Sequence, residues 1–418
     1  MIIQRNNYLN KLIARKHNHL IKIITGIRRS GKSFLLFNLF KSHLLSEGVD
    51  KSHIIEIELD NRLNKELRDP DNCLKFVIEK IVDDEMYYLF IDEVQYMAEF
   101  EDVLNSFLHI ENLDTYVTGS NSKFLSTDII TEFRGRGDEI HVNPLSFAEY
   151  YATCSDKTWD EAWNIYHTYG GLPYTALLEN EEDKIAYLQK LFDEVYIRDI
   201  KERNKVIYDQ QMQTLLDIIS SGIGSLTNPQ KLEKTFKSTG KAQLSASTIK
   251  QYLDHFIDAY LVEKAERYDI KGKKYISTPQ KYYFTDLGLR NVRLNFRQQE
   301  ETHIMENIIY NELRLRGFSV DVGVVEINER QPNDKYVRKQ IEIDFVANKG
   351  SRRYYVQSAF ALPSEEKRIQ EERPLINVSD SFKKIIVVKD NIQLHRDNEG
   401  VTTMGLKQFL LDANSLDL

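Results

Sequence analysis

One short segment carries the residue types that hold a phosphate group. Residues 26–33 read Gly-Ile-Arg-Arg-Ser-Gly-Lys-Ser, which fits the pattern G-x-x-x-x-G-K-[ST]. The glycines let the backbone turn with its N–H groups facing inward, and the helix that follows adds its positive N-terminal end. Lys32 would reach the β- and γ-phosphates, and the Ser33 hydroxyl would bind Mg²⁺. A plain glycine-rich turn is the alternative. The residues expected to contact ATP are Gly26, Ile27, Arg28, Arg29, Ser30, Gly31, Lys32, Ser33 and Phe34.

Two carboxylates follow an apolar run at residues 87–91. Asp92 at the end of this run can hold Mg²⁺ through water, and Glu93 can polarise the water that attacks the phosphate. Acidic strand ends are common, but this one lies 60 residues after Lys32 in an alternating α/β segment, which favours the catalytic interpretation. Ser120 ends another apolar run and would lie beside the γ-phosphate, unless its segment is simply a turn.

The elements that must position these residues alternate between strands and helices. Short apolar strands are predicted at residues 22–25, 54–59, 87–91 and 115–118, and a helix at residues 33–40. Strands that alternate with helices indicate a parallel sheet covered on both faces. After Pro144 the pattern predicts only helices as far as residue 219, and residues 220–225 read as a linker. From residue 302 a helix leads into four strands, at residues 319–325, 340–347, 353–358 and 384–388.

Length and composition exclude several classes of protein. The chain has 418 residues, of which 41% are hydrophobic and 29% charged, so it is long enough for several domains with real cores. The longest apolar runs fall far short of the roughly 18 residues of a membrane helix. The two cysteines, Cys73 and Cys154, exclude a disulfide framework and a cysteine zinc site. We expect a cytoplasmic protein without a signal peptide, because basic residues interrupt the N-terminal segment at Arg5, Lys11, Arg15 and Lys16.

The charge is uneven along the chain. The net charge is −8, yet residues 231–297 contain 14 Lys/Arg against 7 Asp/Glu, a local excess of +7. A predicted helix there exposes Lys250, and a predicted turn between two strands carries Lys271, Lys273 and Lys274. Such a helix and turn suit contacts with DNA phosphates. A spacer that binds only protein is the alternative.

Several segments together resemble a known family, the prokaryotic AAA+ ATPases with a C-terminal nuclease-like domain. The segments that carry the resemblance are residues 26–33 (GIRRSGKS), 90–95 (FIDEVQ), 118–122 (TGSNS), 144–150 (PLSFAEY), 170–173 (GGLP), 196–200 (YIRDI) and 283–289 (YFTDLGL). The resemblance implies an α/β fold with an AAA+ parallel-sheet core at residues 1–150 and a helical lid at 151–225. It further implies a winged helix at 226–300 and a degenerate PD-(D/E)XK restriction-endonuclease-like domain at 301–418.

The same resemblance implies roles for further residues. Arg136, with Arg134 as the second choice, would reach the γ-phosphate of a neighbouring subunit and stabilise transition-state charge. This role predicts a homo-oligomer, with a hexamer as one arrangement, whereas the alternative is a structural arginine in a glycine-rich turn. Leu172 and Pro173 would press against the adenine ring, unless they only begin a helix.

The last segment has part of the layout of a metal-dependent nuclease. Glu306 and Asp344 could supply two carboxylates, and Glu342 is expected to point to the opposite face of its strand. Gln357 stands at the position for the remaining acid and supplies at best a neutral carbonyl. Ala359 stands at the position for the catalytic lysine and supplies no functional group. We therefore predict that this domain does not cut DNA, with Lys367 as the one substitute lysine.

The function predicted from these residues is Mg²⁺-dependent ATP hydrolysis coupled to C-terminal modules that act on DNA. One alternative is an ATP-controlled switch or scaffold that acts through protein partners without DNA contact. Another is an active nuclease with an ATPase motor, which Ala359 argues against.

Overall fold

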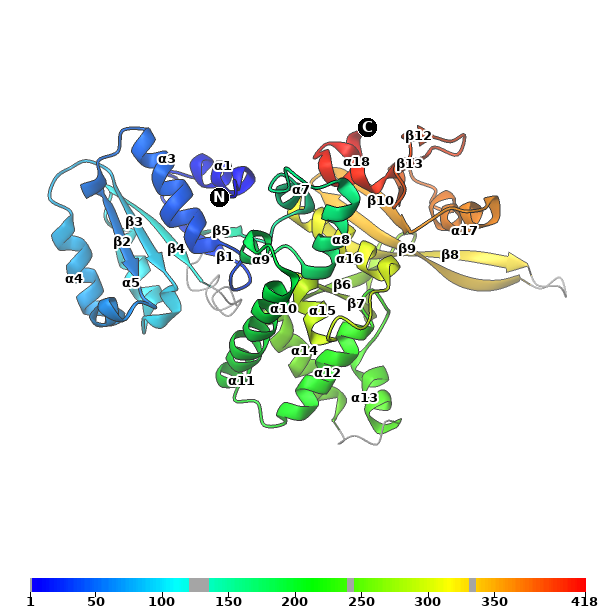
Figure 1. Cartoon of the computed structure of the whole chain (residues 1–418), viewed down its shortest axis with the longest axis horizontal. Coiled ribbons are helices and arrows are strands. Elements are labelled where there is room, and N and C mark those ends of the chain that lie inside the picture. Colours follow the sequence, from blue (N-terminus) through cyan, green and yellow to red (C-terminus); the bar gives the residue numbers. More distant parts are fainter. Residues whose placement is uncertain (1, 120–134, 239–243, 331–335) are drawn as a thin grey trace. The chain divides into compact units, whose positions relative to one another are not determined.

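The computed structural model describes residues 2–119, 135–238, 244–330 and 336–418, which form two compact units (Figure 1). Unit 1 contains Met1–Pro144, Leu172–Leu177 and Asp258–Tyr260, and unit 2 contains Leu145–Gly171, Leu178–Ile257 and Leu261–Leu418. In the described ranges the structure has no helix that combines the length and the apolar character needed to span a membrane.

Unit 1 is built on a five-stranded parallel sheet. Its strands are β1 (Ile21–Thr25), β2 (Ile54–Glu58), β3 (Tyr87–Asp92), β4 (Leu113–Thr118) and β5 (Gly137–His141), in the order β2-β3-β4-β1-β5. All four of its pairings are parallel, so the strands end at one edge of the sheet. The predicted strands and the parallel sheet are confirmed.

Helices cover both faces of this sheet, as the near-continuous burial of its central strands β3, β4 and β1 requires. One face packs against α1 (Asn6–Ala14) and a continuous helix made of α2 (Lys32–Phe34), the wider π-helical turn η1 (Leu35–Phe40) and α3 (Lys41–Ser46). The other face packs against α4 (Pro70–Lys80) and α5 (Phe100–Phe107). The helix predicted at residues 33–40 is therefore present and continues to Ser46.

The first part of unit 2 is helical, as predicted. Ser146 with Glu149, and Thr158 with Glu161, form capping boxes that begin α7 and α8. The helices are α7 (Phe147–Tyr151), α8 (Trp159–Tyr169), α10 (Glu181–Lys190), the π-helical η6 (Leu191–Ile197), α11 (Arg198–Asn204), α12 (Asp209–Ser221), α13 (Pro229–Ser238), α14 (Ala246–Asp258) and α15 (Leu287–Arg293). The short α9 (Pro173–Leu177) belongs to unit 1.

The segment at residues 220–225, predicted as a linker, is packed instead. Ser220, Ile223 and Gly224 are buried, and the Gly224 N–H donates to the Tyr282 carbonyl at 3.3 Å. The glycine and serine content that suggests a linker here serves close packing, because a side chain at Gly224 would meet Glu306 Oε1 at 3.1 Å.

The second part of unit 2 is an eight-stranded sheet, in the order β12-β13-β11-β10-β9-β8-β6-β7. The four predicted strands are confirmed as β8 (Ser319–Arg330), β9 (Tyr336–Lys349), β10 (Arg352–Ala359) and β11 (Lys383–Val388). The sheet also contains β6 (Val262–Asp269), β7 (Lys274–Phe284), β12 (His395–Arg396) and β13 (Val401–Gly405). Its helices are α16 (Glu301–Leu315), α17 (Glu365–Ile376) and α18 (Leu406–Leu411).

The hairpin formed by β6 and β7, here called the basic hairpin, is part of this same sheet. β6 pairs antiparallel with β7 and parallel with β8, so strands from before and after residue 300 share one sheet. The predicted turn with Lys271, Lys273 and Lys274 is confirmed, and all three side chains are exposed. Lys281 and Arg290 from the same basic stretch are buried, so only part of the local +7 charge reaches the surface.

Candidate nucleotide and ion-pair sites

The predicted phosphate loop lies between β1 and α2 at the carboxyl edge of the unit 1 sheet. Gly26 has φ +133°, and a Cβ atom there would lie 2.1 Å from the Val142 carbonyl oxygen. Only glycine therefore fits at this position of the loop. Gly31 has φ +94° and directly precedes α2. The backbone thus makes the turn that the motif requires, with a helix N-terminus behind it.

Lys32 is held inside its own loop. Its Nζ donates to the carbonyl oxygens of Gly26 at 3.0 Å and Ile27 at 3.1 Å, and the residue is only 4% exposed. Burial lowers the pKa of Lys32 to about 8, although the carboxylates of Glu93 and Asp92 oppose this shift. Neutral carbonyls compensate this ammonium only in part, which leaves it ready to bind an anion.

The structure brings the two predicted magnesium ligands together. Ser33 Oγ donates to Asp92 Oδ1 at 2.9 Å, and Thr118 Oγ1 also donates to this oxygen. Burial raises the pKa of Asp92, and these hydrogen bonds oppose the shift. Among the described residues no group of three or more His, Cys, Asp or Glu is arranged to hold a metal. A hydroxyl and one carboxylate nevertheless fit Mg²⁺, which takes oxygen ligands and completes its shell with phosphates and water. Mg²⁺ bound there would neutralise phosphate charge.

Glu93 lies directly beyond the end of β3. Its backbone has a left-handed φ of +50°, and its N–H donates to Thr118 Oγ1 at 3.0 Å. Gln95 Nε2 donates to the Glu93 carboxylate. The sequence analysis does not predict this contact, although Gln95 stands only two residues after Glu93. The amide therefore holds the carboxylate predicted to act as the base.

Arg5 is a positioning residue that sequence reasoning missed. It is 4% exposed, and its guanidinium donates to the carbonyls of Ser30 at 3.0 Å and Asn143 at 2.8 Å. It also lies 4.7 Å from the centroid of the Tyr8 ring. Arg5 thus supports the phosphate loop from the segment before α1, and no motif marks it.

Leu172 and Pro173 belong to unit 1 and lie near the loop. Leu172 is buried, and the Pro173 Cγ lies 3.6 Å from where a Cβ atom of Gly31 would be. Pro173 begins α9, so the predicted helix start is confirmed. Its predicted contact with adenine stays a prediction.

Arg136 directly precedes β5 and is exposed. Its carbonyl accepts from the Ile21 N–H at 2.9 Å, which places it at the amino edge of the sheet. The phosphate loop follows the opposite end of β1, a strand length of roughly 16 Å away at about 3.3 Å per residue. Ser120 and Arg134 lie outside the described residues, so their predicted roles stay predictions.

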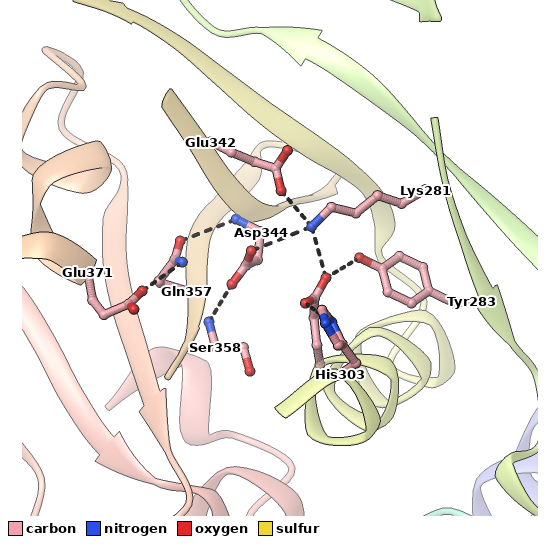
Figure 2. A network of polar contacts seen from close by, with 9 residues as sticks. Lys281, Tyr283, His303, Glu342, Asp344, Gln357, Ser358 and Glu371 are labelled. Atoms are coloured by element: carbon pink, nitrogen blue, oxygen red, sulfur yellow. Dashed lines mark hydrogen bonds and ion pairs between the residues drawn. The ribbon is translucent and has the colours of Figure 1, made fainter. Parts of the chain in front are cut away.

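The predicted carboxylates of the C-terminal segment meet around a lysine (Figure 2). Glu306 Oε1 lies 2.9 Å from Lys281 Nζ, and Asp344 Oδ1 lies 3.7 Å from it. The expectation that Glu342 points to the opposite face is wrong, because Glu342 Oε1 lies 2.5 Å from the same nitrogen. Residues 342 and 344 are two apart in β9 and so share one face.

The residues at the degenerate positions have other partners. Gln357 Oε1 accepts from the Asp344 N–H at 3.3 Å, and its amide donates to Glu371 Oε2 at 3.0 Å. Ala359 is buried in an apolar cluster. Lys367 lies 2.5 Å from Glu371 Oε1. These residues do not fit a divalent metal, since an ammonium stands among the carboxylates and an amide replaces the remaining acid.

The sheet order, the phosphate loop and the Ser33–Asp92 pair together form a core of the kind found in P-loop nucleotide-binding proteins. Residues 18–151 match the AAA domain family, and residues 160–300 match a domain of unknown function, DUF8612. An uncharacterised protein of Haemophilus influenzae is 32% identical over 391 residues, which cover 92% of this chain and 93% of the relative. The chain therefore belongs to one family with this Haemophilus protein.

Two further proteins are similar to this chain. An uncharacterised protein of Methanocaldococcus jannaschii is 27% identical over 347 residues, covering 80% of this chain and 73% of the relative. The solved structure of a Walker-type ATPase from Pyrococcus abyssi has a TM-score of 0.50 at 15% identity, covering 70% of this chain and 96% of that one. The second likeness is one of fold alone, and it agrees with the predicted parallel-sheet core.

Proposed function

We propose that the protein is a cytoplasmic, Mg²⁺-dependent ATPase that couples hydrolysis at one site per chain to its C-terminal modules. The observation that carries the proposal is the 2.9 Å contact between Ser33 Oγ and Asp92 Oδ1 beside a loop that holds a partly compensated lysine, Lys32. Mg²⁺ would bind at the pair, and Lys32 would turn from its carbonyls to the β- and γ-phosphates. Ser120 would contact the γ-phosphate, while Leu172 and Pro173 would contact adenine.

Glu93 is assigned to orient and polarise the attacking water. Glu93→Gln keeps the shape and the contact distance but removes the basic carboxylate, so this variant should bind ATP and fail to hydrolyse it. The measurement is ATP binding and turnover on the same preparation, with the exposed Glu111→Gln as a matched control. Turnover of Glu93→Gln at the wild-type rate would contradict the proposal.

The active site is completed by Arg136 of a neighbouring copy, in a homo-oligomer such as a hexamer. The position of Arg136 at the amino edge of the sheet supports this, since it lies too far from its own loop to act there. An arginine supplied in trans is worth about 10³–10⁵ in rate. Arg136→Ala should bind ATP and hydrolyse it poorly, and mixing it with Lys32→Ala should restore some activity. No rescue, with activity independent of protein concentration, would indicate a self-contained site.

DNA would bind at the hairpin turn with Lys271, Lys273 and Lys274, and α14 would add Lys250 as in a winged helix. The exposure of these lysines supports the assignment. Each phosphate contact on duplex DNA adds about −0.9 to the slope of log affinity against log salt. Replacing the three turn lysines with alanine should therefore weaken binding and flatten this slope. The matched control replaces three exposed lysines elsewhere, Lys75, Lys190 and Lys205. Unchanged affinity in the turn variant would remove DNA from the proposal.

The C-terminal strands would form a restriction-endonuclease-like fold that docks or assembles but does not cut. The succession of α16, three antiparallel-paired strands, α17 and the parallel β11 supports this, as do the partners of Gln357 and Ala359. The test is incubation with plasmid, linear and branched DNA in Mg²⁺ and separately in Mn²⁺. Cleavage that disappears in Asp344→Ala would overturn the proposal.

The second candidate function is a slow ATP-controlled switch that acts through protein partners. The Gln95 amide on the Glu93 carboxylate favours it, because this contact occupies an oxygen that a base needs. ATP turnover measured with and without single-stranded, duplex and branched DNA separates the two. Strong stimulation by one DNA form supports the first function, and slow turnover unaffected by DNA supports the switch.

A further inference from the structure

The carboxylate cluster of unit 2 surrounds a single buried ammonium group (Figure 2). Lys281 projects from β7, and its side chain is only 5% exposed. Its Nζ lies 2.5 Å from Glu342 Oε1, 2.9 Å from Glu306 Oε1 and 3.7 Å from Asp344 Oδ1. The three carboxylates come from α16 and β9, whereas the cation comes from a strand at the far edge of the same sheet.

We propose that the Lys281 ammonium occupies the position where these three carboxylates would otherwise hold a divalent cation. The protein thus carries its own fixed cation there, and removal of Lys281 turns the cluster into a divalent-cation site. The inference deepens the proposed lack of cleavage by this module. Its readout is metal binding rather than turnover or cleavage, so the two proposals can fail separately.

Two of the three carboxylates also have neighbours other than Lys281. Glu306 Oε1 accepts from Tyr283 Oη at 2.7 Å, and Glu306 Oε2 lies 3.9 Å from His303 Nδ1. Asp344 Oδ2 accepts from the Ser358 N–H at 2.9 Å. Mg²⁺ would demand near-octahedral oxygens at about 2.0–2.1 Å, which these atoms cannot supply while Lys281 stands between them.

The charge balance of the cluster supports the same conclusion. Burial works against the Lys281 ammonium, yet the carboxylates, Glu306 foremost, outweigh it and raise its pKa. Burial and then the Glu306 charge raise the pKa of Asp344 to about 8, while Lys281 and hydrogen bonds overcome the effect of burial and lower the pKa of Glu306. Two like charges in one buried site cannot both ionise easily. Without the ammonium the carboxylates would need another cation or further protons.

A fixed ammonium has a structural consequence that a metal ion does not share. Because Lys281 is covalently part of β7, its ion pairs join the hairpin strand to α16 and β9 under all metal concentrations. The backbone at Gly224 also packs against this cluster, since a Cβ atom at Gly224 would lie 3.1 Å from Glu306 Oε1. The cluster therefore fastens the basic hairpin to the C-terminal strands.

The test titrates the full-length protein with Mn²⁺ in the absence of nucleotide and follows binding by electron paramagnetic resonance. All variants carry Asp92→Asn, which removes the carboxylate that pairs with Ser33 beside the phosphate loop. Lys281→Gln should gain a saturable Mn²⁺ site that the parent lacks, and adding Asp344→Asn should abolish it. Lys264→Gln, which changes an exposed lysine on the neighbouring strand β6, is the matched control and should gain nothing.

A second variant covers the case in which Lys281→Gln fails to fold. Lys281→Gln combined with Glu342→Gln removes one charge of each sign and keeps Glu306 and Asp344. Mn²⁺ should raise the melting temperature of this variant and leave that of the parent unchanged. The proposal is overturned if the parent already binds Mn²⁺ in a manner lost with Asp344→Asn, or if a folded Lys281 variant binds none.

Discussion

Lys32 and Lys281 are buried to the same degree and behave in opposite ways. Each is 4% exposed, yet the pKa of Lys32 is lowered to about 8 and the pKa of Lys281 is raised. Burial disfavours the ammonium in both cases. The difference lies in the partners, which are two carbonyl oxygens for Lys32 and three carboxylates for Lys281.

A third buried lysine has an intermediate number of carboxylate partners. Lys22 on β1 is fully buried and pairs with one carboxylate, Asp114, and its pKa is still lowered because burial outweighs that partner. Around Lys22 the paired carboxylate does not offset burial, whereas around Lys281 the three carboxylates do. The charge of the partners, more than burial, therefore distinguishes Lys32, which can bind an anionic ligand, from Lys281, whose ion pairs stabilise the fold.

The comparison first predicts different costs to stability. Lys281→Met removes the ammonium that the three carboxylates share, and breaking a buried pair in this way costs about 3–5 kcal/mol. Urea unfolding followed by tryptophan fluorescence measures it, because Trp159 and Trp163 both lie in unit 2. Lys264→Met is the exposed control and should change the free energy of unfolding by less than about 0.5 kcal/mol. A similarly small loss in Lys281→Met would contradict the structural role.

The second prediction concerns Lys32, whose loss should affect chemistry and not stability. Lys32→Met removes the cation expected at the transferred phosphate, and loss of one such electrostatic contact lowers turnover about 10²–10³-fold. Stability of unit 1 should hold, since a buried charge with partial compensation is removed. Steady-state ATP hydrolysis is the measurement, and the exposed Lys75→Met is the control. Near-normal turnover in Lys32→Met would place the phosphates elsewhere.

The third prediction uses pH to separate the two lysines. Below pH 8 the free protein already carries the Lys32 ammonium, so ATP affinity should not depend on this group. Above pH 8 binding must restore a proton, because phosphates favour the charged form, and affinity should fall by up to about tenfold per pH unit. Calorimetry in buffers of different ionisation enthalpy measures the proton uptake. Lys281 stays charged over this range because its pKa is raised, so the stability of unit 2 should not fall above pH 8 through this group. A loss of unit 2 stability that begins near pH 8 would contradict the predicted difference between the two lysines.

The phosphate loop could be predicted from the sequence because its function is local. Eight consecutive residues, one strand before them and one helix after them are enough to define it, and the carboxylates at the end of β3 follow from a single apolar run. Parallel strands then bring Asp92 to the loop without any further information. Ser33 and Asp92 meet for that reason.

The ion-pair cluster could not be predicted because its members are joined only by tertiary packing. Lys281 lies 25 residues before Glu306, and no spacing rule connects a strand of the hairpin with a helix beyond it. Arg5 was missed for the same reason, since its partner Asn143 is 138 residues away. The error at Glu342 had a different cause, because strand parity alone places residues 342 and 344 on one face.

The smallest predicted effect tests whether the ammonium, rather than the neighbouring hydroxyl, compensates the charge of Glu306. Tyr283 Oη donates to Glu306 Oε1 at 2.7 Å in a fully buried position. Tyr283→Phe removes this donor and leaves Lys281 in place, so unit 2 should lose only about 1 kcal/mol of unfolding free energy, a typical net hydrogen bond. The exposed Tyr336→Phe is the control, and tryptophan fluorescence again follows the unfolding. Combined with Lys281→Met, the two losses should not add, because both groups contact the same carboxylate oxygen. A loss in Tyr283→Phe as large as that in Lys281→Met would assign the compensation to the hydroxyl and break the contrast between the two lysines.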